Sequence, residues 1–188
     1  MKPSLFLASA AACLSFAAVP AMDAAVTLQE RPGYVDLGAF AAPESGGQFV
    51  EINVQGVLLS LAARIVAAEE PAVAEIIRGL HAVRVNVVTI DDSNREVLLQ
   101  RIDSIRENLQ SKGWESVATV RDGNDNVAVY VKSGEGETIE GVTLTVLNGT
   151  GEAVFINVVG NIQPEQIAML GERLDIEPLK RVDATTGS

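Results

Sequence analysis

The chain of 188 residues carries 25 acidic and 14 basic side chains, which gives a formal net charge of −11 at pH 7. Because nucleic acids and anionic lipids attract clustered lysine and arginine, this balance argues against nucleic acid as a partner. The chain has one cysteine, Cys13, and one histidine, His81, which excludes an internal disulfide and a multi-histidine metal site. We therefore expect no cofactor.

The first 21 residues are typical of a secretory signal peptide. Lys2 precedes an almost unbroken apolar run over 5–19, and small residues stand before a predicted cleavage point after Ala21. Cleavage removes 21 of the 188 residues, leaves 167, and changes the net charge from −11 to −12 because Lys2 is lost. The apolar run is too short to span a bilayer core of about 30 Å, so we interpret it as a cleaved signal and not as a membrane-spanning helix. We predict no transmembrane helix in the mature chain. The alternative is a lipid anchor at Cys13, which follows three alanines.

The first part of the mature chain combines a lead-in, a strand and two helices. We expect residues 22–31 to be flexible, and the apolar segment 34–40 is a candidate for a first strand. Apolar and polar side chains alternate over 49–55, which is typical of a strand with one buried face. Helical spacing follows over 57–68 and again over 71–80, where the leading proline suits a first helical turn.

The first of these helices carries an apolar stripe that we expect to face the core, because the helices of globular domains bury such a stripe. Its members are Leu58, Leu61, Ala62 and Ile65. Membrane insertion is the alternative interpretation of the run over 57–68, but the run is short and contains Arg64.

Residues 81–90 alternate as a further strand, and the clearest helix of the chain follows it. Ser93 and Glu96 have the spacing of a capping box, in which the two side chains satisfy free backbone N–H groups at the start of a helix. The apolar stripe of this helix consists of Leu98, Ile102, Ile105 and Leu109. Gly113 supplies the left-handed residue that ends such a helix.

The C-terminal half is a succession of short strands separated by turn sequences. The predicted strands cover 115–121, 127–132, 138–147 and 152–160. Glycine and asparagine between them favour tight hairpins, because both residues tolerate a positive φ. A short final helix is predicted from Pro164 to about Leu174, and the tail over 177–188 has little apolar surface to bury.

These elements predict a single α+β domain over residues 32–176, followed by a disordered tail. The expected architecture is a mixed or antiparallel sheet of five to seven strands with helices packed on one face, ending in a C-terminal β-meander and a short helix. Because one set of strand positions is aliphatic and the other is largely polar, we expect the helices to cover the aliphatic side.

The polar side of the predicted sheet is a candidate interaction face. If helices cover only the aliphatic side, this face is open to a partner, a ligand or a second copy. It consists of Glu51, Asn53, Arg84, Asn86, Tyr130, Thr143, Thr145 and Asn157. An ordinary solvated sheet surface is the alternative interpretation.

No residue pattern predicts a catalytic site. The chain lacks the G-x-S-x-G, S-x-x-K and H-E-x-x-H motifs of common hydrolases. Asp91 and Asp92 precede a predicted helix, where negative charge is favourable without any catalytic role. His81 lies between a helix and a strand, where a structural role is the simpler interpretation. We therefore expect a protein that is not an enzyme.

Several of these elements together resemble the exported bacterial proteins of the family labelled domain of unknown function 4252. The matching segments are 50–54, 93–112, 126–132, 141–146 and 154–162. The resemblance extends approximately from Pro32 to Leu174 and rests on the strand pattern and a strand ending in Gly160 and Asn161, not on a catalytic signature. It implies an exported bacterial α+β domain and no activity that can be transferred. Relatives are often lipid-anchored, whereas this chain departs from a good lipobox before Cys13.

These features predict a periplasmic or secreted bacterial envelope protein that acts as a non-catalytic binding or adaptor module, with an envelope protein as its partner. A carrier of a small molecule or lipid is an alternative, and it requires a closed apolar cavity between the helices and the sheet. A hydrolase that uses carboxylates such as Asp91 or Glu51 is a further alternative, and it requires two carboxyl groups that converge in a cleft.

Overall fold

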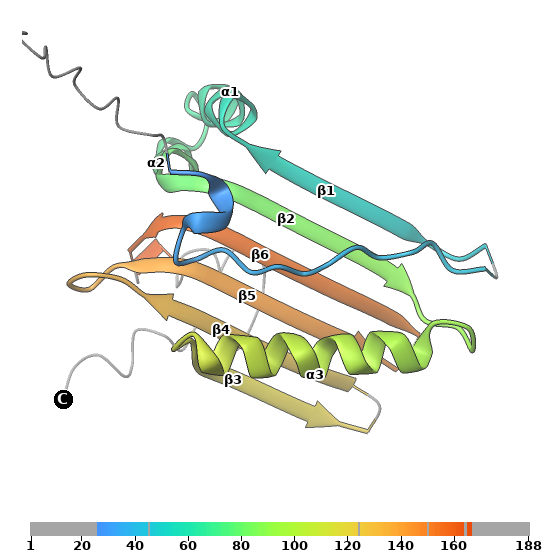
Figure 1. Ribbon diagram of the computed structural model, residues 1–188. Coiled ribbons are helices and arrows are strands. Elements are labelled where there is room, and N and C mark those ends of the chain that lie inside the picture. Colours follow the sequence, from blue (N-terminus) through green and yellow to red (C-terminus); the bar gives the residue numbers. More distant parts are fainter. Residues whose placement is uncertain (1–25, 45, 124, 150, 164, 167–188) are drawn as a thin grey trace, which may run out of the picture.

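Six strands form one antiparallel sheet in the spatial order β1-β2-β6-β5-β4-β3 (Figure 1). The computed structural model describes residues 26–44, 46–123, 125–149, 151–163 and 165–166. The strands are β1 (Phe49–Gln55), β2 (Leu80–Thr89), β3 (Glu115–Asp122), β4 (Asp125–Ser133), β5 (Ile139–Asn148) and β6 (Glu152–Ile162). All neighbouring strands run antiparallel. The predicted α+β class is therefore confirmed, and the consecutive strands β3 to β6 form the predicted meander.

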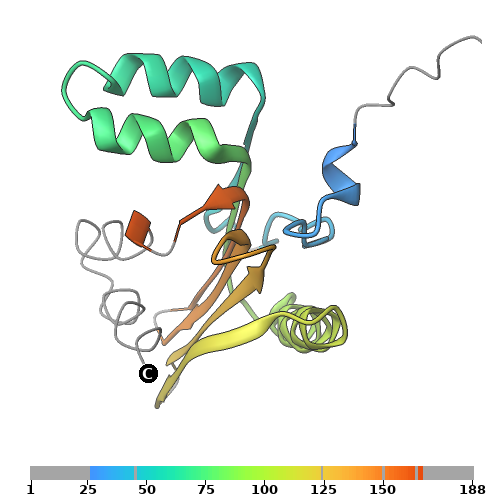
Figure 2. The ribbon, with the colours of Figure 1, turned by 90° about the vertical axis from the view of Figure 1, so that its left-hand side faces the viewer.

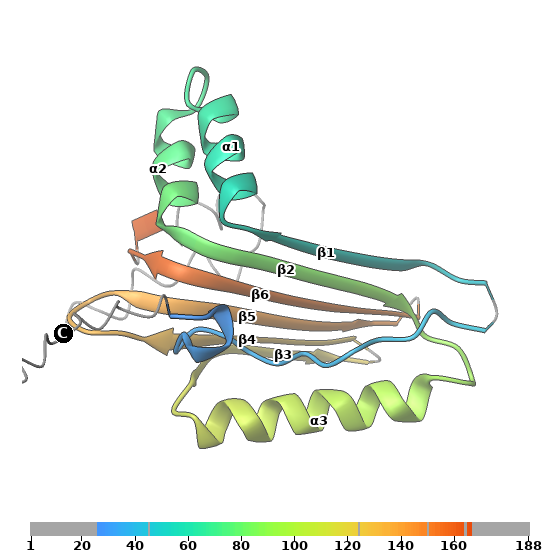
Figure 3. The same ribbon diagram turned by 45° about the horizontal axis from the view of Figure 1, so that its top comes forward.

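Three helices and a 3₁₀ turn accompany the sheet in the described residues. Helices α1 (Val57–Val66) and α2 (Pro71–Gly79) form a hairpin between β1 and β2, and α3 (Arg95–Ser111) connects β2 to β3. Figure 3 shows that α3 runs along one face of the sheet, whereas the α1–α2 hairpin stands where β1 ends and β2 begins. The 3₁₀ turn η1 (Leu28–Glu30) lies at the same end of the molecule as the α1–α2 hairpin.

The packing of α3 follows its predicted stripe, but the start of the helix does not follow the predicted capping box. All four stripe residues are buried. The helix begins at Arg95, and no capping box forms between Ser93 and Glu96. Instead, the Asp91 carboxylate accepts hydrogen bonds from the backbone N–H groups of Ser93 and Asn94 at 2.9 and 3.1 Å. An aspartate side chain readily binds the backbone two and three residues further on, and this turn takes the place of the serine cap.

Residues 33–40, called the strap below, cross the same face of the sheet as α3 in an extended conformation (Figure 1). They pair with no strand, so the prediction of a strand over 34–40 is wrong. Val35 and Leu37 are nevertheless buried, because they pack into the main core with α3 and the sheet. Gly33 permits this close approach, since a Cβ atom there would lie 1.8 Å from the Glu140 carbonyl oxygen.

The face of the sheet that α3 and the strap cover is opposite to the predicted one (Figure 2). Phe155 of β6 is fully buried in the main core on this face. Asn86 and Thr145 are its cross-strand partners, so their side chains share its face. The prediction failed because large core side chains such as Phe155 and Tyr130 alternate on the same face with small polar ones.

Three predicted segments lie largely or wholly outside the described residues. They are the signal peptide over 1–21, the final helix beyond residue 166 and the tail over 177–188. Their predictions therefore stay predictions.

Candidate functional site

Most of the predicted interaction face lies in the interior of the protein. Its buried members are Asn86, Tyr130, Thr143, Thr145 and Asn157. Arg84 is half-buried, and only Glu51 and Asn53, on the edge strand β1, are exposed. The face was expected to be open because its side chains are polar, but α3 and the strap cover it. Its buried members are therefore unavailable as a docking surface.

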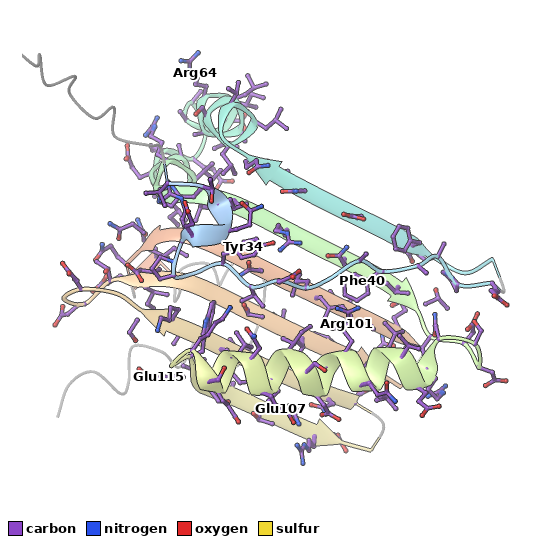
Figure 4. The ribbon with its side chains drawn as sticks, in the orientation of Figure 1. Tyr34, Phe40, Arg64, Arg101, Glu107 and Glu115 are labelled. Atoms are coloured by element: carbon purple, nitrogen blue, oxygen red, sulfur yellow. The ribbon has the colours of Figure 1, made fainter. Side chains whose placement is uncertain are left out.

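Two polar side chains of this covered face, Asn157 and Arg84, hold the strap in place. Asn157 accepts a hydrogen bond at Oδ1 from the Val35 N–H at 3.1 Å and donates one from Nδ2 to the Gly33 carbonyl at 3.0 Å. Arg84 donates from Nη1 to the Val35 carbonyl at 2.7 Å, and its guanidinium lies 5.1 Å from the centre of the Tyr34 ring. Further along the strap, Arg101 and Phe40 face each other (Figure 4). These contacts assign a structural role to Asn157 and Arg84.

Helix α1 exposes the apolar stripe that was predicted to face the core. Three of its four members are exposed, with exposed fractions of 55% for Leu58, 52% for Leu61 and 68% for Ile65, whereas Ala62 is half-buried. Val57, at the start of the helix, is 82% exposed beside them. The buried positions of α1 are Leu59 and Ala63, and the helix packs against α2. The stripe prediction is therefore wrong, and α1 carries a row of solvent-exposed aliphatic side chains. Contiguous exposed apolar surface of this kind commonly marks an interaction site.

The composition of α1 indicates this exposed surface, although the spacing of its apolar residues does not. Ser60 and Arg64 are the only polar residues of α1. A helix that is apolar on nearly every side must be packed against other groups on nearly every side to be buried. The short helix α2 packs against only one side of α1. Neither α1 nor any other helix in the described part of the chain is long and apolar enough to span a membrane.

A groove, called the hairpin groove below, lies between α1 and the N-terminal segment around η1. Its volume is about 940 Å³, and it is open to solvent. Its apolar lining consists of Val26, Leu28, Val57, Leu61 and Leu80. Gln55, Gly56 and Ser60 complete the neutral part of the wall. One wall of the groove is thus the exposed side of α1.

The hairpin groove is basic although the protein is acidic. Arg31, Arg64 and His81 line it, and among the described residues its lining includes no aspartate or glutamate. Neither arginine forms an ion pair with another residue in the described ranges. Figure 4 shows Arg64 on the outer side of α1, pointing away from the sheet. This combination suits a ligand that has an apolar surface and carboxylate or similar anionic groups.

The pH dependence of stability provides a test of the environment of His81. Partial burial, and second the positive charge of Arg31, lower the pKa of His81. The folded protein then binds this proton less tightly than the unfolded chain, so protonation of His81 destabilises the fold. This cost is small above about pH 6.5 and grows as the pH falls. We expect the wild type to lose more stability than His81→Gln between about pH 7.5 and about pH 5.5 in urea unfolding. Equal losses in the two proteins would contradict a lowered pKa.

The structure does not bring the candidate catalytic carboxylates together. Glu51 lies in the middle of β1 opposite Asn86, whereas Asp91 lies beyond the end of β2 and binds the turn before α3. Within the described ranges, no group of three or more His, Cys, Asp or Glu residues could hold a metal ion. The largest of the described cavities is the open hairpin groove, whereas a carrier requires an enclosed space between α3 and the sheet.

The comparisons with known proteins identify a family. No curated protein and no solved structure matches the chain. The family model described as Domain of unknown function (DUF4252) matches residues 45–170. The match includes all six strands and all three described helices, and the strap lies before it. This match agrees with the family resemblance in the strand pattern of the sequence. Because it spans more than half of the chain, the protein belongs to the DUF4252 family.

Proposed function

We propose that the protein is an exported, non-catalytic binding module of the bacterial envelope, which docks an amphipathic, acid-bearing segment of a partner protein in the hairpin groove. Export is supported by the basic residue, apolar run and small residues of the first 21 positions. The observation that carries the binding role is the row of exposed aliphatic side chains on α1, which borders a groove with arginines and no acidic lining.

The shape of the exposed surface suits a helical segment. Helix α1 has ten residues and is therefore about 15 Å long. Val57, Leu61 and Arg64 line the groove at spacings of four and three residues, so they form one ridge along the helix. Helices pack by fitting such a ridge into the grooves of a partner helix, and amphipathic helices bind to apolar grooves through residues at the same spacing.

The charge of the groove selects an acidic segment. Arg31 and Arg64 can each bind a carboxylate, and an anion there also relieves the repulsion between Arg31 and a protonated His81. With a net charge of −11, the rest of the surface repels an acidic partner, so electrostatics orient the partner toward this groove. An anionic bilayer is a poorer occupant, because a flat surface would also meet the surrounding negative charge.

A photo-crosslinking amino acid at Val57 tests this proposal in the native envelope. We expect a crosslinked protein whose trapped peptide, identified by mass spectrometry, is amphipathic and rich in Asp or Glu. Leu61→Asp should lower the crosslinking yield at least tenfold, because burying a leucine contributes about 1.5–3 kcal/mol and about 1.4 kcal/mol corresponds to a factor of ten. Arg31→Ala combined with Arg64→Ala should lower it as well.

Val120 on β3 provides the matched control, because its side chain is 45% exposed at the opposite edge of the sheet. A probe at Val120 should not trap the same peptide, and Val120→Asp should leave the Val57 yield unchanged. Circular dichroism checks that Leu61→Asp is folded, as expected for a side chain that is 52% exposed. A yield that is insensitive to Leu61→Asp, or adducts with lipid alone, would contradict the proposal.

A further inference from the structure

The two edges of the sheet differ in how they are protected against pairing with another strand. At one edge, β3 has an irregular register between Ser116 and Ala118 and carries the charged residues Glu115, Arg121 and Asp122. At the other edge, β1 pairs with β2 in a regular register, and its seven residues include one charged side chain and no proline. Bulges, charges and prolines are the usual devices that prevent edge pairing. The β1 edge therefore lacks most of them.

The backbone N–H and C=O groups of four β1 residues point away from β2, toward the unpaired edge of the sheet. The Thr89 N–H donates to the Gln48 carbonyl at 2.9 Å, so these two residues form a hydrogen-bonded pair. Such pairs alternate along antiparallel strands. Residues 50, 52 and 54 therefore bond to β2, and Figures 1 and 3 show none of the described helices or strands along the outer side of β1. The N–H and C=O groups of residues 49, 51, 53 and 55 point to this outer side.

We propose that a second copy of the chain pairs antiparallel with β1, with Ile52 on the two-fold axis, so that two six-stranded sheets become one. In this register Phe49 lies opposite Gln55 of the second copy, and Glu51 lies opposite Asn53. Both are pairs of outward-facing residues, so all four form hydrogen-bonded pairs. The whole of β1 takes part, from its first residue to its last.

The neighbouring registers are less favourable. A two-fold axis at Glu51 places two carboxylates directly opposite each other, which is destabilising. An axis at Asn53 pairs Phe49 and Val50 with residues beyond the end of β1, where Gly56 has φ 55° and α1 begins. The axis at Ile52 avoids both problems, because the single acidic residue of the strand meets an amide.

The side chains also favour the axis at Ile52. The Ile52 side chain is 43% exposed, and Val50 and Val54 are half-buried on the same face of β1. Directly opposite residues in a non-hydrogen-bonded pair have Cα atoms about 4.5 Å apart, which brings the two Ile52 side chains into contact. Val50 then meets Val54 of the second copy on each side of the axis. Pairing thus removes an exposed isoleucine from water in both copies.

Single-cysteine variants test this register, with Cys13→Ser as the background. Ile52→Cys should form disulfide-linked dimers at least tenfold faster than Val120→Cys, because a Cα separation of about 4.5 Å lies within the range of disulfides. Val120 is a matched control, since it is 45% exposed on the other edge strand. Val50→Cys and Val54→Cys should form no disulfide-linked dimer alone, because each lies about 13 Å from its own copy in this register. Mixed together, the two variants should form a disulfide between position 50 of one copy and position 54 of the other.

Sedimentation of the cysteine-free protein provides a second measurement. The wild type should be a dimer, and Ile52→Lys should raise its dissociation constant at least tenfold, because two lysines would face each other on the axis. Val120→Lys should have no effect. The proposal would be overturned if disulfides formed no faster at position 52 than at position 120. It would also be overturned if the wild type stayed monomeric at about 100 μM. Leu61→Asp should remain dimeric, which separates this test from that of the hairpin groove.

Discussion

Replacing Phe155 by alanine is expected to lower the free energy of unfolding by about 4 kcal/mol. Phe155 is fully buried in β6, beneath α3 and the strap, and its ring centre lies 4.7 Å from that of Phe40. Removing the ring leaves a cavity where the strap, α3 and the sheet meet, and the hydrogen-bonded sheet cannot collapse to fill it. Equilibrium unfolding in urea measures the loss.

Two matched variants define the control for Phe155. Val120→Ala on β3 should change the stability by at most about 0.5 kcal/mol, because its side chain is 45% exposed. Phe155→Leu should cost less than Phe155→Ala, because leucine fills part of the cavity. A loss below about 2 kcal/mol for Phe155→Ala would contradict the assignment of the covered face.

Replacing Asn157 by alanine should destabilise the protein by about 3 kcal/mol, because the buried Val35 N–H and Gly33 carbonyl both lose their side-chain partner. Asn157 is fully buried, and its amide also donates to Thr143 Oγ1 at 3.2 Å. An exposed polar face would tolerate this substitution. The expected loss therefore distinguishes a covered face from an open one, and urea unfolding measures it.

Asn161→Ala is the matched control for Asn157, since Asn161 is an exposed asparagine of the same strand. It should be close to neutral. Loss of the Asn157 amide should also loosen the strap, so limited proteolysis should cleave Asn157→Ala earlier than the wild type within residues 33–40. Wild-type stability together with wild-type protease resistance would show that the strap does not depend on Asn157.

Local sequence patterns predicted most of the individual elements. The alternation over 49–55 predicted β1 with its observed bounds, and the spacing of Leu98, Ile102, Ile105 and Leu109 predicted the buried side of α3. These predictions succeeded because the pleat of a strand and the turn of a helix are local geometry, and each leaves its period in the sequence. The meander was predictable for the same reason, since hairpin turns join consecutive strands.

The strap shows where local patterns fail. Its apolar residues Val35 and Leu37 are typical of a strand, and they are buried as a strand would require. The strap is nevertheless held by Asn157 and Arg84, which lie far away in the sequence, and not by a strand ladder. Such contacts between distant residues have no periodic signature.

The sequence by itself determined the α+β class, the positions of nearly all strands and helices, and the scarcity of catalytic groups. Only the tertiary structure decided which sides of these elements are covered. Alternation distinguishes the two faces of a sheet, but the positions of α3 and the strap decide which face is buried. In the same way, α1 is apolar on almost every side, and its contact with α2 decides that Leu61 and Ile65 face solvent. The physical reason is that burial depends on long-range packing, whereas periodicity reports only the local geometry of the backbone.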